Sequence, residues 1–214
     1  MAHHQINPPE TEGRLIRWAS FYDFVTGFLT FGQAKRLRTM TIDNTGLKPG
    51  ESVLDVGCGT GGVTLPAKER VGATGIVAGI DPAPEMISVA QQKARRKGLE
   101  IDFRVGVIEA LPFQDATFDA VTASLMMHHL PEPLQTKGLA EIYRVLKPGG
   151  RLLIADMVGA KSPTSQRVLS SFTLHHGIKF GIDQLLDMLE KAGFREVAQL
   201  EQRFFVIGFV RAVK

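Results

Sequence analysis

The sequence predicts a single α/β domain in which a parallel sheet carries helices on both faces. Between residues 52 and 156, apolar runs of strand length alternate with helical patterns, as is typical of βαβ units. The first run, VLDVGCGTGG at 53–62, ends in glycines that let a strand turn sharply into a helix. The chain has 214 residues, of which 44% are hydrophobic and 22% charged, enough for one domain with a sizeable core.

The composition narrows the environment and the partners of the protein. Cys58 is the one cysteine of the sequence, which excludes an intramolecular disulfide and a thiolate metal cluster and fits a reducing cytosol. We find no signal peptide and no apolar run of membrane-spanning length, so we expect a cytoplasmic protein that at most lies on a membrane surface. The net charge of +3 is modest, and no aromatic-plus-basic pattern indicates nucleic-acid binding. The sequence leaves the oligomeric state open.

Residues 1–46 are expected to form a helical cover before the first strand. Apolar side chains dominate the stretch from Leu15 to Leu29, and such a surface has to pack on the domain or cover a site. Basic residues flank this stretch, so one interpretation is a mobile lid for a lipophilic acceptor at a membrane surface. The other is a helix that only packs on the sheet. A second helix is predicted at 33–45, ending before Gly46.

Residues 47–157 are expected to form the core that binds a ligand. Short apolar runs and longer helical patterns follow one another here with little connecting chain. The predicted strands are 52–56, 75–80, 101–107, 118–123 and 151–156. Helices are predicted at 62–70, 82–97 and 133–146.

The pattern changes after the fifth predicted strand. Residues 158–180 lack a clean periodicity, as expected of a cap inserted over the site. The last part of the chain, 181–214, is predicted to form a helix at 182–192 and an antiparallel hairpin of two strands, 196–202 and 204–212. We find no internal repeat and no second domain.

The glycine-rich loop carries the main chemical signal. Gly57, Gly59 and Gly62 satisfy G-x-G-x-x-G, a pattern that also occurs in dinucleotide-binding proteins and is weak on its own. Asp55 stands where nicotinamide-binding loops usually carry an apolar residue, and its carboxylate suits a cationic ligand group such as an ammonium. Asp81 lies at the C-terminal end of the second predicted strand, directly after residue 80. In the purely structural interpretation, Asp55 and Asp81 only stabilise turns and caps.

Four further motifs follow the glycine loop along the chain: GIDPAPEM (79–86), EALPF (109–113), FDAVTAS (118–124) and RVLKPGGRLLIAD (144–156). In this order they resemble the class I S-adenosylmethionine-dependent methyltransferases. FYDFVTGFLTFG (21–32) also resembles the cover helices of the ubiquinone and menaquinone biosynthesis branch. The resemblance implies a doubly wound, Rossmann-like sheet of seven strands in the order 3-2-1-4-5-7-6, with strand 7 antiparallel, and S-adenosylmethionine as the cofactor.

The resemblance also assigns roles around that cofactor. Asp81 would accept hydrogen bonds from both ribose hydroxyls, and Asp55 would orient the ammonium, directly or through water. Gly57 and Gly59 would let the backbone approach the ligand closely. Met86 would pack either on the adenine or only in the core. The further cofactor-binding positions that the resemblance implies are Cys58, Thr60, Pro82, Val107, Ile108, Ala123 and Ser124.

Two departures from the family pattern stand out. Gly106, Val107 and Ile108 replace the common Gly-Asp-Ala, so the adenine loses one hydrogen bond worth about 0.5–1.5 kcal/mol, although Val107 can pack on its face. His128 and His129 replace the Arg-Asn pair of the quinone branch. On a strand these two side chains would diverge, which argues against a metal ion shared between them.

The leading function is transfer of a methyl group to an oxygen, nitrogen or carbon atom of a small molecule, such as a quinone precursor, a phospholipid or a natural product. Positioning in a water-poor pocket supplies most of the rate, and no metal is required. His128 is the candidate base, with Tyr22 and His175 as further candidates for binding the acceptor. In the structural interpretation, His128 only caps its loop. Two alternatives stay open: an NAD(P)-dependent oxidoreductase and a non-catalytic S-adenosylmethionine-binding protein.

Overall fold

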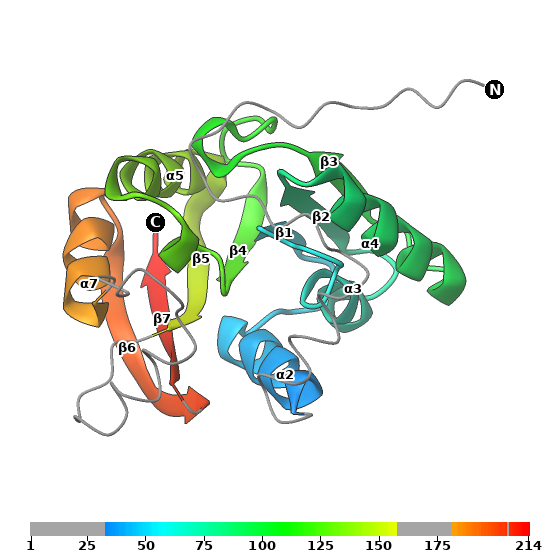
Figure 1. The fold of residues 1–214 in the computed structure, drawn as a ribbon, viewed down its shortest axis with the longest axis horizontal. Helices are drawn as coiled ribbons and strands as arrows, with labels where there is room; N and C mark the ends of the chain where they lie inside the picture. The colour runs from blue at the N-terminus through cyan, green and yellow to red at the C-terminus, as the bar shows by residue number, and fades with distance from the viewer. Residues whose placement is uncertain (1–32, 158–180, 205) are drawn as a thin grey trace.

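The structure, a computed structural model, describes residues 33–157, 181–204 and 206–214 (Figure 1). Its seven strands form one sheet in the order β3-β2-β1-β4-β5-β7-β6. The strands are β1 (Ser52–Val56), β2 (Ile76–Asp81), β3 (Asp102–Val105), β4 (Phe118–Ser124), β5 (Leu146–Met157), β6 (Arg195–Phe204) and β7 (Ile207–Val213). The helices are α2 (Ala34–Thr45), α3 (Thr64–Val71), α4 (Pro84–Lys97), α5 (Glu132–Val145) and α7 (Ile182–Lys191), with 3-10 turns η1 (Ile108–Ala110) and η2 (Met127–His129).

The pairing of the strands confirms the predicted topology. The neighbours β3, β2, β1, β4 and β5 all run parallel. The last strand, β7, runs antiparallel to both of its neighbours, β5 and β6, and β6 and β7 form the predicted terminal hairpin. The strand order reverses at β1, which pairs with β2 on one side and with β4 on the other. In open parallel sheets such a switch point opens the crevice where ligands bind.

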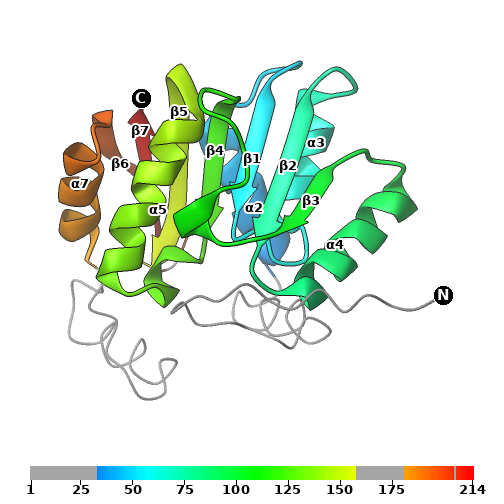
Figure 2. The same cartoon turned by 90° about the horizontal axis from the view of Figure 1, so that it is seen from above.

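Helices cover both faces of the sheet (Figure 2). Two of them, α2 and α3, contact β1, β2, β4 and β5 from one side, whereas α4, α5 and α7 contact the sheet from the other. Side chains alternate along β1: Val53 packs in a cluster with Ile42 of α2 and Ala67 of α3. Its neighbour Leu54 packs in the largest cluster, with Ile142 of α5. Asp55 therefore faces the same side as α3.

The predicted boundaries differ from the structure where the backbone depends on long-range pairing. β1 has the predicted bounds, but β5 begins at Leu146 instead of residue 151, because Leu146 already pairs with Phe118. The register then shifts before Ala120 pairs with Arg151, so residues 147–150, which lie between the predicted helix and the predicted strand, are part of β5. α3 begins at Thr64, two residues later than predicted.

Parts of the predicted domain plan lie outside the described residues. These are the first cover helix, the cap at 158–180, and with them the acceptor-binding candidates Tyr22 and His175. The second cover helix is α2, within one residue of its prediction. Within the described ranges, no helix combines the length and the apolar character needed to cross a bilayer.

Ion pairs fasten the amino ends of the central strands. Arg151 donates to the carbonyl oxygens of Thr45 at 2.8 Å and Gly46 at 2.9 Å, and to the Glu51 carboxylate at 2.5 Å. The arginine thus ties the end of α2 to the start of β1 and to β5. A second pair, Lys147–Asp119, joins β5 to β4 at 2.9 Å.

Candidate functional site

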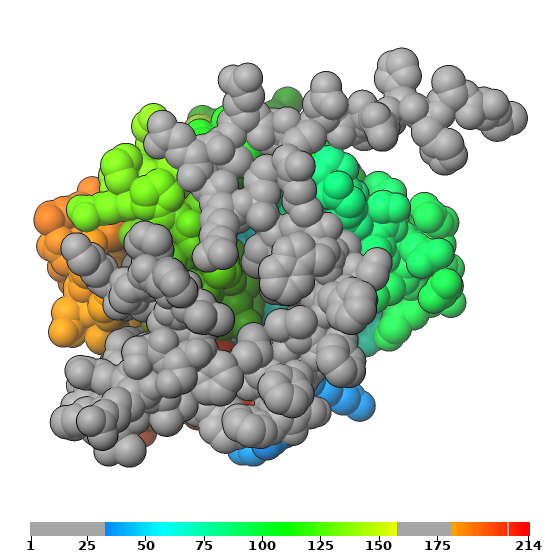
Figure 3. All heavy atoms as spheres, in the orientation of Figure 1, coloured from blue at the N-terminus to red at the C-terminus, as the bar shows by residue number. Residues whose placement is uncertain are grey.

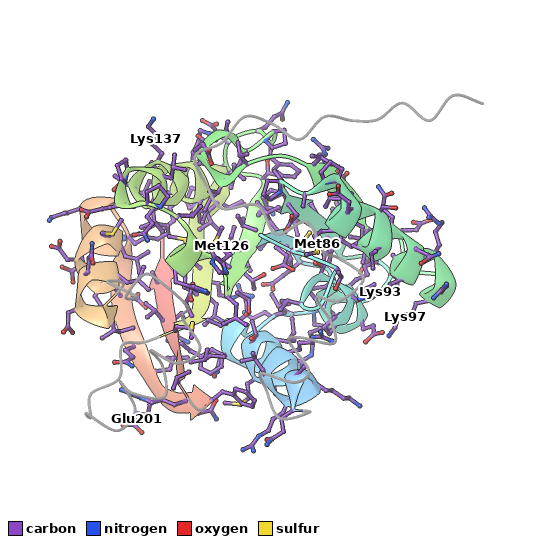
Figure 4. The ribbon with its side chains drawn as sticks, in the orientation of Figure 1. Met86, Lys93, Lys97, Met126, Lys137 and Glu201 are labelled. Carbon is purple, nitrogen blue, oxygen red and sulfur yellow. The ribbon has the colours of Figure 1, made fainter. Side chains whose placement is uncertain are left out.

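The glycine loop leaves β1 through left-handed backbone. Gly57 has φ 68° and Gly59 φ 52°, values that favour glycine. A Cβ on Gly57 would lie 2.8 Å from the Cβ of Met126, which stands near the centre of the molecule (Figure 4). The close approach at Gly57 is therefore made by Met126. Leu125, just before it, has φ 55°, an uncommon conformation for leucine that turns the chain at the end of β4.

Asp81 links the end of β2 to the glycine loop. One carboxylate oxygen accepts the N–H of Gly59 and the other accepts the N–H of Ala83, both at 2.9 Å. Burial raises the pKa of Asp81 despite these two bonds. A carboxylate offers about four lone-pair positions, so each oxygen can accept one more hydrogen bond. Two neighbouring ribose hydroxyls require this arrangement.

Asp55 is a buried carboxylate with neutral hydrogen-bond partners. Asp55 is only 1% exposed to solvent. It accepts hydrogen bonds from the hydroxyls of Thr64 on α3 at 2.6 Å and Thr122 on β4 at 2.8 Å. Burial raises the pKa of Asp55 to about 6, although the two hydroxyls act in the opposite direction. A cationic ligand group next to this carboxylate would be stabilised and would in turn lower its pKa.

A pocket lies at the switch point of the sheet, between the carboxyl ends of β1 and β4 and the starts of α2 and α3. It brings together five predicted cofactor-binding residues: Asp55, Gly57, Cys58, Thr60 and Ser124. The pocket is also lined by Gly62, the last glycine of the G-x-G-x-x-G pattern. Sequence reasoning missed the other five lining residues, which are Ala34, Leu37, Arg38, Val63 and Leu125. In the space-filling view, α4 and α5 occupy opposite sides of the presented face, and α2 lies at its lower edge (Figure 3).

Other predicted cofactor residues have mainly buried side chains. Met86 is 2% exposed and packs with Ala83 at the start of α4. Ile108 is 5% exposed and belongs to the main core cluster, with Gly138 of α5 leaving room for its side chain. Val107 is half-buried. A role for these residues toward adenine stays a prediction.

Two further predicted cofactor-binding residues, Pro82 and Ala123, lie at the ends of β2 and β4. Pro82 is half-buried between β2 and α4, and Ala123 is fully buried in β4. The alanine side chain therefore serves the core, and only its backbone could face a ligand.

His128 and Asp156 form a hydrogen-bonded pair at the carboxyl ends of β4 and β5. The His128 Nδ1 lies 2.5 Å from one Asp156 oxygen, and the side chains are 11% and 2% exposed. The same carboxylate accepts the backbone N–H groups of Met127 at 2.8 Å, His128 at 3.3 Å and Met157 at 2.7 Å. With Nδ1 donating to the carboxylate, Nε2 is the nitrogen that can take a proton.

The expectation that His128 and His129 diverge is wrong. Both residues lie in the 3-10 turn η2 rather than on a strand, so their side chains do not alternate between two faces. The ring centroids are 3.9 Å apart and the rings are tilted by 44°. Nothing in this contact assigns His129 a role in catalysis.

Asp156 is the functional candidate that sequence reasoning missed. A signal was present: Asp156 is the last residue of the fifth predicted strand and lies one residue before the end of β5, much as Asp81 ends β2. Carboxyl ends of parallel strands meet at one edge of the sheet, so both acids were placed to face the site. The partner of Asp156, the turn after β4, could not be read from local pattern.

Comparison with known proteins supports the assignment of this chain to the methyltransferases. The family described as "Methyltransferase domain" matches residues 53–150. The chain is 38% identical to the ubiquinone/menaquinone biosynthesis C-methyltransferase UbiE of Escherichia fergusonii over 220 residues, which cover 92% of this chain and 87% of that protein. The chain belongs to this methyltransferase family.

Two further relatives of this methyltransferase agree. The demethylmenaquinone methyltransferase of Thermus thermophilus is 39% identical over 135 residues, which cover 63% of this chain and 60% of that enzyme. A crystal structure of a SAM-dependent methyltransferase from Aquifex aeolicus matches with a TM-score of 0.67 at 28% identity. That match covers 82% of this chain and 88% of the other.

The protein is thus a class I methyltransferase that uses S-adenosylmethionine, and the oxidoreductase alternative is set aside. Its residues fit the cofactor. Asp81 has acceptor positions for the ribose diol, since its two bonds to Gly59 and Ala83 leave lone pairs on both oxygens. Asp55 supplies a buried carboxylate whose partners are neutral hydroxyls, as the ammonium requires.

Proposed function

We propose that this methyltransferase methylates a carbon of a hydroxylated aromatic ring, of the kind found in quinone precursors, and that His128 takes the proton of the ring hydroxyl. The ring is suggested by the relatives, whose names specify C-methylation in ubiquinone and menaquinone biosynthesis. The base is suggested by one observation, the 2.5 Å contact between His128 Nδ1 and Asp156. This contact supports Nε2 of His128 as the atom that accepts the proton.

The chemistry of such a ring explains why a base is useful. S-adenosylmethionine supplies a methyl group on a positively charged sulfur, which departs as a neutral thioether. A neutral phenol is a poor carbon nucleophile, whereas the phenolate carries negative charge on the ring carbons beside the oxygen. His128 Nε2 accepts the hydroxyl proton and so creates that charge. Asp156 stabilises the imidazolium that results, through the hydrogen bond to Nδ1. The ring carbon then bonds the methyl group as the sulfur–methyl bond breaks. The hydrogen on that carbon leaves as a proton to the solvent, which restores the aromatic ring, and the imidazolium returns its proton to the ring oxygen.

The pair must also hold its geometry. Because Asp156 accepts backbone N–H groups from η2, it fixes the turn as well as the ring. The hydrogen bond from Nδ1 to Asp156 holds the imidazole ring and favours the tautomer in which Nε2 can accept a proton.

The test separates turnover from binding. The substrate panel contains a demethylated menaquinol and a matched ring whose hydroxyl is blocked as a methyl ether, with labelled methyl donor and mass spectrometry locating the label. His128→Gln should lower turnover about 10²–10⁴-fold while S-adenosylmethionine affinity stays unchanged. His129→Gln, which alters the neighbouring ring of the same turn, is the control and should stay within a few-fold of the parent.

Asp156→Asn sharpens the assignment. It leaves the ring in place but removes the charge that stabilises the imidazolium, so turnover should fall while S-adenosylmethionine affinity stays unchanged. Label on oxygen or nitrogen would overturn the carbon assignment. Equal turnover of the His128→Gln enzyme and its parent across pH 6–9 would leave His128 as a purely structural link between η2 and β5.

A lipophilic acceptor implies a place of work. We infer that the protein acts in the cytoplasm and meets its acceptor at a membrane surface, helped by the basic residues of its N-terminal segment. Sedimentation with vesicles that contain anionic lipid, but not with neutral vesicles, is the expected result. Absence of binding to both would place the acceptor in solution.

A further inference from the structure

One face of α2 forms a wall of the pocket. Ala34, Leu37 and Arg38 all line it, and their spacing of three and four residues places them on one side of the helix. Leu37 is 4% exposed and packs in a cluster with Phe209 and Leu153. Leu37 therefore anchors the helix on the sheet, and this packing fixes the position of the neighbouring Arg38 backbone.

The guanidinium of Arg38 lies on the backbone of the glycine loop. A Cβ added to Gly62 would stand 2.9 Å from Arg38 Nε and 3.3 Å from its Cζ. Unlike Gly57 and Gly59, Gly62 has no left-handed φ, so its conformation does not require glycine. The absent side chain instead leaves space for the arginine head group.

Among the described residues that line the pocket, one side chain is acidic, that of Asp55, and one is basic, that of Arg38. The amino-acid end of S-adenosylmethionine carries one ammonium and one carboxylate. The geometry points to Arg38 as the residue that binds this carboxylate, while Asp55 faces the ammonium. A guanidinium matches a carboxylate with two parallel N–H···O bonds, which a lysine cannot reproduce. The inference rests on S-adenosylmethionine as donor and is independent of the acceptor and of His128.

The test compares two methyl donors that differ only at the group in question. Decarboxylated S-adenosylmethionine keeps the ammonium, the sulfonium and the nucleoside but lacks the carboxylate. Calorimetry on the full chain gives the affinity for each compound. Arg38→Met should weaken binding of S-adenosylmethionine about 10- to 100-fold and leave binding of the decarboxylated compound within about two-fold of the parent.

Matched variants make the comparison specific. Arg36→Met removes an exposed arginine of the same helix, whose guanidinium donates to the Gln33 side chain at 3.3 Å, and should change neither affinity. Arg38→Lys keeps the charge but not the fork, so it should give an intermediate loss for S-adenosylmethionine alone. Gly62→Ala keeps Arg38 but pushes its head group away, and should reduce the preference for the carboxylated compound even if Arg38→Met does not fold.

Each outcome decides the matter. A loss confined to the carboxylated donor in the Arg38 and Gly62 variants establishes the role. An equal loss of affinity for both compounds would mean that Arg38 only supports the structure of the loop. Unchanged affinity for both would mean that Arg38 does not contact the donor. A parent protein that binds the two compounds equally overturns the inference without touching the methyl acceptor, because that acceptor is absent from the experiment.

Discussion

At the carboxyl ends of the strands, burial raises the pKa of Asp55 to about 6 and also raises that of Asp81. At the amino ends the result is opposite. Burial alone would raise the pKa of Glu51, but hydrogen bonds from Arg151 and from the backbone of Lys48 outweigh it, and the pKa is lowered.

The difference lies in the partners. Each acid at the amino ends has a cation: Arg151 for Glu51 at 2.5 Å and Lys147 for Asp119 at 2.9 Å. Asp55 instead has two neutral hydroxyls. One end of the sheet is neutralised for stability, while the other keeps negative charge for a positively charged donor. Function at that end therefore costs stability until the donor binds.

The largest expected effect is on the pH dependence of folding at the site end. The pKa of Asp55 is about 6 in the folded protein against 3.8 ordinarily. A raised folded pKa gives stability that is fully present below about pH 3.8 and lost as pH rises through 6. Between pH 4 and pH 8, the parent should lose about 2–3 kcal/mol relative to Asp55→Asn.

Urea unfolding of both proteins at a series of pH values gives this difference. Asp43→Asn, an exposed acid that pairs with Arg70 on the surface, is the control and should track the parent at every pH. If the free energy of unfolding changed with pH in the same way for Asp55→Asn and for the parent, ionisation of the buried Asp55 would not destabilise the fold.

The second effect concerns donor binding. Asp81→Ala removes the acceptor for the ribose and also two backbone bonds, to Gly59 and Ala83. S-adenosylmethionine should bind about 1.5–3 kcal/mol more weakly. Asp81→Asn keeps one acceptor oxygen and should lose less. Calorimetry with unchanged affinity in both variants would remove the ribose assignment.

The third and smallest effect tests the amino ends. Arg151→Met deletes bonds to Thr45, Gly46 and Glu51 and should lower the free energy of unfolding by about 2 kcal/mol, with donor affinity within two-fold of the parent. Arg70→Met, which breaks an exposed pair with Asp43, should cost no more than about 0.5 kcal/mol. A strong loss of donor affinity in Arg151→Met would show that the two ends are coupled.

The fold was predictable where the signal is local. The sequence VLDVGCGTGG placed β1 within its observed bounds, because the strand, its glycines and the next helix follow one another directly. The predicted start of β5 lies five residues too late, since the pairing of Leu146 with Phe118 depends on a strand 28 residues away. The sheet order came from the family resemblance and is confirmed.

The site was predictable in its acids but not in their partners. Asp55 and Asp81 follow from their place at strand ends. The bond from Thr122 joins residues 67 apart, and that between His128 and Asp156 joins residues 28 apart, so neither could be seen in a local pattern. In the sequence, Arg38 is one of the basic residues that follow the apolar stretch from Leu15 to Leu29. Its place in the pocket depends on the packing of α2 on the sheet, so the sequence alone does not show it.

The central claim is that Asp55, at the carboxyl ends of the strands, has no cationic partner among the described residues until the ammonium of the donor binds. The most direct test is the number of protons released when the donor binds. Calorimetry of S-adenosylmethionine binding in buffers of different ionisation enthalpy gives that number. At pH 6 about half of the Asp55 side chains carry a proton, given a pKa of about 6, and binding the ammonium requires the ionised form. The parent should therefore release about 0.5 proton more than Asp55→Asn at pH 6, with no difference at pH 8. Equal proton release by the two proteins at pH 6 would contradict the account.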